Sequence, residues 1–582
     1  MKKALLSRQL RAESASFWLR QGHFGSRWTC NPSPTRWRCY ASSAAPPKAK
    51  PYYITTPIFY VNADPHVGHL YTLVLTDILK RWQVLKGREA ILCTGTDEHG
   101  MKIQRAAASA DSEPKPFCDK GAEVFKDLAK KAAITNDHFV RTTDPDHREA
   151  VEYIWHLLRE RGYIYSSKHE GWYCVSDETF YPQSAVQLIL DPRTGRKMMT
   201  SIETGKEVEW TSESNYHFRL SAFKDRLLDF YEKNPNFIIP QKRMNNVVQA
   251  VTSGLEDLSI SRPSERLTWG IRVPGDSSQT IYVWLDALIN YLTKSGFPWT
   301  PGKESIGGWP ADCQVIGKDI VRFHCIYWPA FLLALDIEPP KQVLTHAHWT
   351  LGREKMAKST GNVVNPFFAL DRFGVDVMRY YLARDGGISN DSDYGNPYII
   401  ARYKKDLQAG LGNLSSRILR GKGWNVRRAV EAAHGNEIPP EDELSSTHGT
   451  LLETLADQVD GRFSDLDVGG ALKSIIEVVY STNRYLQSST PWDLVKSESS
   501  LDKARIDVII YHCAETLRIC GILLQPYMPN KASELLDMLG VAAENRSFSS
   551  ALFNGDSQYG NSKVDLGKGH RGTLFPPLDS DF

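Results

Sequence analysis

The sequence predicts an α/β protein in which a Rossmann-type parallel-sheet domain is split by a small insertion domain and followed by an α-helical bundle. Three observations support this fold class. A strand, a turn, a helix and a strand follow one another from Tyr52, the same order returns near Cys313, and apolar residues recur at helical spacing from about Asn396 to Gly540. A chain of 582 residues is also too long for one ordinary domain, so several are expected.

The first β-α-β unit begins with a short apolar strand over residues 52–57. Asp64 is expected to cap the following helix, with Pro65 at its first position. Gly87 should end that helix, and residues 90–93 should form a second buried strand. The helix itself is predicted from apolar and aromatic residues at three- and four-residue steps, namely Val67, Leu70, Tyr71, Val74, Leu75, Ile78, Leu79 and Trp82.

The second half of the sheet repeats this order much further along the chain. Residues 313–316 are predicted as a strand, residues 317–319 as a turn, and the chain to Leu335 as a helix before a strand over residues 343–347. Because the two halves are separated in sequence, the segment between them must leave the sheet and return to it.

The remaining segments differ from the sheet in pattern. Short strand-like pieces and turns over residues 165–235 predict the insertion domain. The segment 546–570 is rich in Gly, Ser and Asn and is expected to be a loop or partly disordered, while residues 574–577 are expected to pack back onto the body. The bundle is predicted from two apolar stripes, Leu407, Leu411, Leu414 and Ile418, and then Val468, Leu472, Ile475, Ile476 and Val479.

Composition excludes several classes of protein. A net charge of +2 leaves any nucleic-acid contact to local patches. The nine cysteines include no CxxC pair, which argues against a disulfide framework and against a four-cysteine zinc site. No apolar run approaches the roughly 20 residues that cross a bilayer, so no membrane association is expected.

The first 50 residues resemble a mitochondrial transit peptide in composition. They hold ten Lys or Arg but one acid, Glu13, together with several Ser and no uniformly apolar segment. Arg38-Cys39-Tyr40 before Ala41 resembles a processing site, so removal of residues 1–40 and a location in the mitochondrial matrix are predicted. The alternative is a disordered basic tail that binds RNA or nothing.

Two motifs predict nucleotide chemistry. In Pro65-His66-Val67-Gly68-His69 a helix N-terminus offers unpaired N–H groups to phosphate, Gly68 leaves room for an adenine, and two imidazoles can donate to phosphate oxygens. The alternatives for His66 and His69 are surface histidines or a metal pair. In Lys355-Met356-Ala357-Lys358-Ser359, two lysines on a mobile loop can neutralise a leaving pyrophosphate, although such a loop alone is usually a solvated turn.

Together these motifs resemble the HIGH and KMSKS signatures of class I aminoacyl-tRNA synthetases, with Ala357 in place of the commonest Ser. From Pro51 onward the chain is similar to the methionyl-tRNA synthetase family. The resemblance is carried by residues 56–62 (TPIFYVN), 95–100 (GTDEHG), 282–287 (YVWLDA) and 317–320 (GKDI). It implies catalytic halves over 51–164 and 236–350, a connective insertion over 165–235, a KMSKS-loop and stem-contact region over 351–395, an anticodon-binding bundle over 396–545 and a tail over 546–582.

The resemblance also implies site residues. Those for methionine are Ile58, Tyr60, Asp97, Trp284, Ala287, Tyr291, Ile320 and His324, with Trp328 nearby, and those for ATP are His66, Gly68, His69, Gly317, Asp319, Lys355 and Lys358. Among them His66, His69, Lys355 and Lys358 are expected to be catalytic. Four-residue spacing places Ile320, His324 and Trp328 on one helix face, where an apolar contact, a polar donor and an aromatic wall suit a thioether side chain. Asp97 can accept from the α-ammonium group. Without the motifs, the buried aromatic residues would be interpreted as ordinary core.

Two further expectations concern metal and tRNA. Where many relatives carry CxxC zinc knuckles, this chain reads Cys174-Val175-Ser176-Asp177 and Ser201-Ile202-Glu203-Thr204, so no structural zinc is expected. Asn413, Arg417 and Trp492 match the family's readers of the CAU anticodon, since amide and guanidinium groups can bond base edges and an indole can stack on a base. The alternative for Asn413 and Arg417 is a solvated helix face.

The predicted reaction joins methionine and ATP, bound with Mg²⁺, into methionyl-adenylate and then transfers the methionyl group to the terminal ribose of tRNA(Met). A monomer is expected. Three alternatives fit the sequence less well. A class I synthetase for leucine, isoleucine or valine has an editing domain much larger than this insertion, and a tRNA-binding paralogue without activity should lack a signature His or Lys. A small nucleotidylyltransferase would not explain the bundle.

Overall fold

The computed structural model describes residues 49–175, 177, 179–191, 194–300, 302–356, 362–435, 442–562, 564–566 and 572–578, with the backbone alone at His169 and Lys355. The chain divides into Met1–Ala49 and one compact unit from Lys50 to Phe582, and the description concerns the second. The predicted transit peptide, residues 1–40, lies outside the described residues. None of the described helices is long and apolar enough to span a bilayer.

A six-stranded sheet, parallel throughout, forms the centre of the first part of the unit, in the order β3-β2-β1-β14-β15-β9. Its strands come from two stretches of chain, as the α/β prediction requires. They are β1 (Tyr52–Tyr60), β2 (Ala90–Asp97), β3 (His138–Arg141), β9 (Ile238–Ile239), β14 (Cys313–Gly317) and β15 (Val343–His346). Strands β1 and β2 run further than the sequence predicted, so Asp97 ends a strand.

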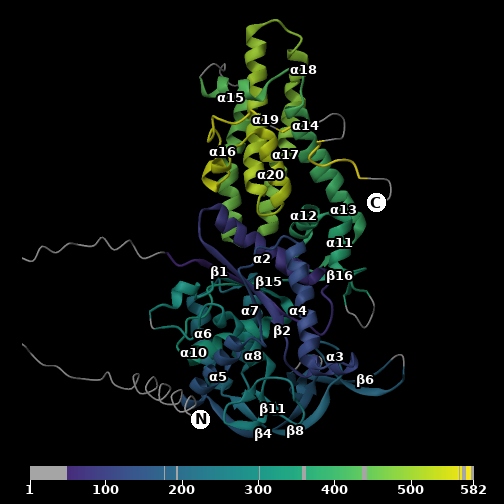
Figure 1. Ribbon diagram of the computed structural model, residues 1–582, viewed down its shortest axis with the longest axis vertical. Helices are drawn as coiled ribbons and strands as arrows, with labels where there is room; N and C mark the ends of the chain where they lie inside the picture. The colour runs from purple at the N-terminus through teal and green to yellow at the C-terminus, as the bar shows by residue number, and fades with distance from the viewer. Residues whose placement is uncertain are drawn as a thin grey trace, which may run out of the picture. The chain divides into compact units, whose positions relative to one another are not determined.

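Helices cover this sheet and connect its strands (Figure 1). The first stretch contributes α2 (Val67–Leu85), α3 (Met101–Ser109), α4 (Pro114–Lys131) and α5 (Pro145–Glu160). The second contributes α6 (Lys224–Lys233), α7 (Gln241–Ser253), α8 (Val283–Leu288), α9 (Asn290–Thr293) and α10 (Trp328–Ala334). All eight apolar residues predicted for α2 are buried.

The start of α2 differs from the prediction. The N-cap is His66 and not Asp64, and Pro65 precedes the helix instead of opening it. A reciprocal capping box explains the shift: the His66 imidazole accepts from Gly68 N–H at 3.0 Å, and the His69 imidazole accepts from His66 N–H at 3.1 Å. The capping box satisfies the N–H groups of His66 and Gly68. Asp64 could not reach both from its position.

The helix predicted to run to Leu335 is irregular. A 3₁₀ turn over Lys318–Ile320 leads into a π-helical turn over Phe323–Tyr327, and only then does α10 follow. A π turn inserts an extra residue and rotates the side chains that precede it. Ile320, His324 and Trp328 therefore do not share the regular α-helical face that their four-residue spacing predicted.

Antiparallel strands fill the interval between the two halves of the sheet. One sheet has the order β10-β8-β4-β5, and β6 pairs with β7 in a separate hairpin. The strands are β4 (Ile164–Cys174), β5 (Thr179–Tyr181), β6 (Val186–Leu190), β7 (Lys197–Ser201), β8 (Glu209–Phe218) and β10 (Leu258–Ser259), followed by the small sheet of β11 (Ser261–Pro263), β12 (Arg272–Val273) and β13 (Asp276–Ile281). The short strand-like pieces of the sequence are thus strands.

After β15 the chain forms the small sheet of β16 (Trp349–Leu351), β17 (Glu354–Lys355) and β18 (Ser392–Asp393), with α11 (Pro366–Phe373) and α12 (Val375–Asp385) between them. A helical bundle follows (Figure 1). Its long helix α19 packs against α15, α16, α17 and α20. The bundle helices are α13 (Asn396–Arg402), a π-helical segment (Tyr403–Gly412), α14 (Asn413–Leu419), α15 (Val426–His434), α16 (Glu443–Ser464), α17 (Val468–Ser489), α18 (Pro491–Leu494), α19 (Ser500–Leu524) and α20 (Pro529–Leu539).

The described part of the C-terminal segment packs against the bundle. Ala551 and Tyr559 are fully buried although only short 3₁₀ turns occur there. Leu574 and Phe575 are buried too, and the Tyr403 hydroxyl donates to Pro576 O at 2.6 Å. The expectation that residues 574–577 pack back onto the body is confirmed.

Helix α2 also contacts the bundle. A buried ion pair joins its Asp77 to Arg379 of α12 at 2.7 Å, and the Arg379 guanidinium donates further to the carbonyls of Pro526 and Tyr527. Closer to the C-terminal end of α2, Trp82 stacks on Phe463 of α16 with ring centroids 4.0 Å apart. The C-terminal half of the helix whose N-cap is His66 is thereby fixed to the bundle.

Candidate active site

The candidate site lies where the carboxyl ends of β1 and β14 meet. Tyr60 at the end of β1 pairs with Asp97 of β2, and Gly317 at the end of β14 pairs with His346 of β15. The chain leaves β1 toward one side of the sheet and β14 toward the other, since β2 and β15 lie on opposite flanks. Such a switch point in the strand order is where open α/β sheets bind ligands.

His66 and His69 face each other at the start of α2, with ring centroids 3.9 Å apart. Both Nδ1 atoms accept backbone N–H bonds in the capping box. Burial lowers the pKa of His69 well below its usual value, helped by the nearby His66, so this ring is neutral. With Nδ1 an acceptor on each ring, the proton is carried by Nε2, the atom suited to donate to a phosphate oxygen.

The backbone at the helix start does not offer the unpaired N–H groups that the sequence predicted. Val67 N–H donates to Val364 O at 3.2 Å, and Gly68 N–H donates to His66. These N–H groups are occupied by the capping box and by the segment at Val364. Glycine is required at position 68 for the bond between Gly68 N–H and the His66 ring, because a Cβ there would stand 2.7 Å from that ring.

Gly317 and Asp319 lie across from this pair. A Cβ on Gly317 would come within 2.8 Å of Asp319 Oδ1, so glycine permits the tight turn that follows β14. Asp319 is half exposed and pairs with His348 at 3.3 Å. Its charge also acts on the pKa of His69, which it raises against the larger effect of burial. The predicted ATP residues of the two halves therefore meet at one site.

The predicted methionine residues line the edge of one apolar cluster. Tyr291 and Trp328 are buried in it, and four partly buried side chains pack against it, those of Ile58, Tyr60, Trp284 and Ile320. Asp97 and Ala287 are buried beside it, with 3% and 4% of their surfaces exposed. Phe323, which received no role from the sequence, stacks on Trp284 with centroids 3.6 Å apart.

His324 and Tyr291 form a polar contact beside this cluster. The His324 Nδ1–H donates to Ile320 O at 3.0 Å, and Nε2 lies 2.6 Å from the Tyr291 hydroxyl. Burial lowers the pKa of His324 to about 4, so the ring is neutral and Nε2 accepts from Tyr291. The lone pairs of the Tyr291 oxygen are then held in a fixed direction.

Lys102 is a cation at the site that sequence reasoning missed. Its Nζ lies 4.8 Å from the centroid of the Tyr60 ring, and its charge contributes to lowering the pKa of His69. It stands two residues after the GTDEHG segment, and this adjacency was the available signal. Of the loop lysines, Lys355 belongs to β17 by its backbone, and Lys358 lies outside the described residues.

The buried histidines predict a pH dependence of stability. Burial lowers the pKa of His324 and His346 to about 4 and that of His448 to about 3, against about 6.5 when unfolded. Below pH 6.5 the unfolded chain binds protons that the folded chain does not, so stability is full above that pH and falls as the pH drops. The thermal midpoint should decline between pH 6.5 and 5, and less steeply in His448→Gln. An equal slope in the variant would contradict this assignment.

The predicted anticodon residues lie apart from this site, in the bundle. Arg417 lies over the Trp492 ring, with its guanidinium carbon 5.0 Å from the centroid, and contacts Gln487 at 3.5 Å. Asn413 is exposed and donates to Asn483 at 3.3 Å. The structure therefore brings α14, α17 and α18 together around these side chains.

Where many relatives carry a zinc knuckle and none was expected in this chain, Asp177 is the centre of a hydrogen-bond network. Its carboxylate accepts from Cys174 at 3.1 Å, from Thr204 at 2.6 Å and from Lys206 at 2.5 Å. The ammonium group of Lys206 thus supplies the positive charge that balances the Asp177 carboxylate. Within the described ranges no group of three or more His, Cys, Asp or Glu side chains is arranged to hold a metal ion.

Removal of metal should leave this network intact. Dialysis against a strong chelator is expected to keep the thermal unfolding midpoint unchanged, because hydrogen bonds to Asp177 replace metal coordination. Differential scanning calorimetry before and after chelation measures this. A lower midpoint that zinc restores would show that a metal supports the fold.

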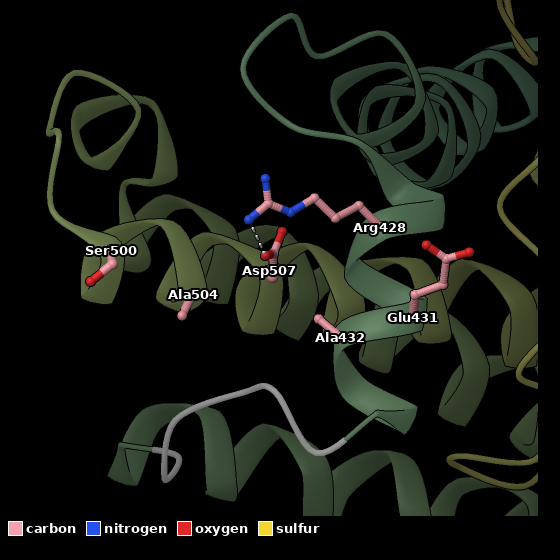
Figure 2. A pocket seen from close by; sticks show the side chains of 6 residues that line it. All are labelled: Arg428, Glu431, Ala432, Ser500, Ala504 and Asp507. Carbon is pink, nitrogen blue, oxygen red and sulfur yellow. Dashed lines mark ion pairs between the residues drawn. The ribbon is translucent and has the colours of Figure 1, made fainter.

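A polar hollow of about 250 Å³ in the bundle is separate from all of these residues (Figure 2). It lies between α15 and α19, where Arg428 reaches across to Asp507 at 3.2 Å while Ser500 and Glu431 stand at its sides. Among the residues that the structure describes, none predicted for methionine, ATP or the anticodon lines it.

Comparisons with known proteins agree with one family. The family described as tRNA synthetases class I (M) matches residues 52–419. A Neurospora crassa protein named probable methionine–tRNA ligase, mitochondrial, is 55% identical over 542 residues, which cover 92% of this chain and 86% of the relative. The human mitochondrial methionine–tRNA ligase is 41% identical over 543 residues, 90% of each chain.

A solved structure agrees as well. Mycobacterium tuberculosis methionyl-tRNA synthetase in complex with methionyl-adenylate superposes with a TM-score of 0.81 at 38% identity, covering 91% of this chain and 100% of that one. The fold, the site and the relatives all indicate the same family. The chain belongs to the methionyl-tRNA synthetases, the class I enzymes that activate methionine with ATP and attach it to tRNA.

Proposed function

We propose that His66, His69, Lys355 and Lys358 carry the catalytic stabilisation of methionine activation. The observation that carries this proposal is the pair of stacked imidazoles at the switch point, in which Nδ1 of each ring accepts a backbone N–H bond, so that the ring proton lies on Nε2. As the methionine carboxylate attacks the α-phosphorus, negative charge builds on the phosphate oxygens. Donors fixed in advance stabilise that charge without reorganisation.

ATP binds with its ribose at Gly317 and Asp319 and its phosphates at the two histidines, beside Gly68. Mg²⁺ enters as part of the ATP substrate. The phosphates and water hold the ion, as is usual for Mg²⁺ bound to a nucleotide. Lys355 and Lys358 neutralise the departing pyrophosphate.

Methionine binds in the aromatic pocket. Asp97 accepts from its α-ammonium group, and the side chain lies among Ile58, Tyr60, Trp284, Ala287 and Ile320. The Tyr291 hydroxyl, oriented by His324 at 2.6 Å, faces the thioether sulfur. An unbranched, polarisable side chain suits a pocket with aromatic walls.

Asn413, Arg417 and Trp492 read the anticodon of tRNA(Met). The single-stranded bases of an anticodon can stack on Trp492 and bond to the amide and guanidinium groups. The 5.0 Å approach of Arg417 to Trp492 supports a shared binding surface. The enzyme works as a monomer in the mitochondrial matrix, after removal of residues 1–40.

Trp492→Ala should raise the KM for tRNA(Met) about 10-fold or more, since stacking is worth ~1–3 kcal/mol per base. Methionine-dependent ATP–pyrophosphate exchange should stay unchanged, because that step needs no tRNA. Steady-state charging of a tRNA(Met) transcript measures the first quantity. Trp210→Ala, which removes an exposed tryptophan of β8, serves as the matched control. A KM unaffected by Trp492→Ala would exclude this residue from anticodon reading.

The experiment that tests the proposed function as a whole is charging by residues 41–582. The protein should attach methionine to tRNA(Met) and should not attach leucine, isoleucine or valine. Charging with any of those three amino acids would contradict the proposal. So would charging, at a rate equal to that of the normal transcript, of a transcript whose CAU anticodon has been replaced.

A further inference from the structure

A buried carboxylate lies behind the methionine pocket and receives bonds from two histidines. Asp286 in α8 is fully buried. Its Oδ2 lies 2.6 Å from His99 Nδ1, and its Oδ1 lies 2.7 Å from His147 Nε2. Both histidines are buried as well, with 6% and 0% of their surfaces exposed. His99 and Asp286 belong to the GTDEHG and YVWLDA segments, but neither they nor His147 have a role in the mechanism above.

The charge state of this group follows from its partners. Burial alone would raise the pKa of the Asp286 carboxyl, but His99 and His147 hold it lowered, at about 2. The group is therefore an ionised carboxylate at neutral pH and can only accept hydrogen bonds. His99 Nδ1 and His147 Nε2 must both donate, which fixes the orientation of each ring.

The network joins segments that carry the proposed methionine contacts. His99 stands two residues after Asp97, where the chain leaves β2. Asp286 itself stands between Trp284 and Ala287 in α8. The bond between His99 and Asp286 thus sets the distance between the proposed ammonium acceptor and the proposed aromatic wall.

The second histidine extends the network to a third part of the pocket. His147 comes from α5, and its Nδ1 lies 3.1 Å from the Thr293 hydroxyl in α9. Thr293 stands two residues beyond Tyr291 in the same short helix. Because α8 and α9 are both short, bonds to a neighbouring helix are needed to hold their side chains in place.

We propose that Asp286 is a positioning residue for methionine, which through His99 and His147 fixes Asp97 relative to Trp284 and Tyr291. It does not touch the substrate. A buried carboxylate with two charge-assisted bonds is a rigid junction, and rigid support of this kind determines whether contacting groups stand at the productive distance. The proposal rests on the role of Asp97 given under the proposed function.

The test compares Asp286→Asn with the parent enzyme. The amide keeps the shape of the side chain but can accept from only one of the two imidazoles. The Kd for methionine, measured by calorimetry, should rise by about 10- to 100-fold, as displacements of about 1 Å commonly produce. The KM for ATP in pyrophosphate exchange should stay unchanged. Equal losses for both substrates, or no loss for methionine, would overturn the proposal.

A double variant separates this proposal from the role of Asp97. If Asp286 acts through Asp97, the Kd of Asp97→Asn combined with Asp286→Asn should be no weaker than that of Asp97→Asn alone. Multiplied losses would overturn the positioning role. An unchanged Kd in Asp97→Asn alone would instead refute the proposed ammonium contact, and the selective effect of Asp286→Asn would still be measured on its own.

Two further variants guard against a fold defect in Asp286→Asn. His99→Asn retains an N–H close to the position of Nδ1 and should keep the parent's methionine Kd within a few-fold, whereas His99→Leu removes the donor and should raise it like Asp286→Asn. The matched control is Asp146→Asn, which breaks the partly exposed ion pair, 2.7 Å long, between Asp146 of α5 and Lys294, the C-cap of α9. It should leave the methionine Kd unchanged, and a rise equal to that of Asp286→Asn would assign the effect to general loosening.

Discussion

His69→Ala should reduce methionine-dependent ATP–pyrophosphate exchange by about 100- to 1,000-fold, the usual effect of removing one donor to a charged transition state. The variant loses the Nε2–H donor and also the acceptor for His66 N–H in the capping box, which holds the second imidazole. The Kd for methionine should change little, because other side chains form the proposed methionine pocket. Exchange kinetics and calorimetry measure the two quantities separately.

His156→Ala is the matched control for this variant, since it makes the same substitution at an exposed position of α5. It should exchange at the parent's rate. If His69→Ala retained more than about a tenth of that rate, the imidazole would not be a principal donor to the transition state.

Arg379→Met should produce the largest loss of stability, about 3–5 kcal/mol, as expected when one partner of a buried ion pair is removed. The substitution removes one of the two guanidinium groups that lie 2.7 Å from Asp77, the other being that of Arg81, and it leaves the carbonyls of Ala132, Pro526 and Tyr527 without this donor. Both charged groups are fully buried, so water cannot replace the lost bonds. Denaturant unfolding followed by circular dichroism measures the loss.

Arg462→Met makes the same change in an exposed ion pair, which joins Arg462 to Asp467 at 3.1 Å. Its effect should stay below about 1 kcal/mol. If the two variants lost the same stability, the buried pair would have no special role in attaching α2 to the bundle.

The sequence predicted the elements whose causes are local. Leu70, Val74 and Ile78 recur at helical spacing, and α2 buries all three. The parallel strands of both halves could be recognised because buried strands are short continuous apolar runs. The order of the motifs along the chain then indicated that His66 and Gly317 meet at one edge of the sheet.

The cap of α2 was predicted wrongly because its stabilisation is reciprocal. Asp64 before Pro65 fits the common pattern of a helix start, whereas His66 ranks low as a capping residue. It caps here because His69 returns the bond one turn later. N-cap preferences are measured for single residues, so they do not account for two side chains that cap the helix together.

The π turn over Phe323–Tyr327 and the buried networks depend on distant contacts. His147 and Asp286 are 139 residues apart in sequence, and Asp77 and Arg379 are 302 apart. No periodicity relates such residues, so their partners appear only when the sheet brings the segments together. An acid in the otherwise apolar stretch YVWLDALI was the one available signal for Asp286.

The most direct test of the account is methionine-dependent ATP–pyrophosphate exchange by residues 41–582, with leucine, isoleucine and valine as parallel substrates and His69→Ala as the blank. The account predicts exchange with methionine alone and its loss in the variant. Exchange with no amino acid, or exchange that His69→Ala retains in full, would contradict it.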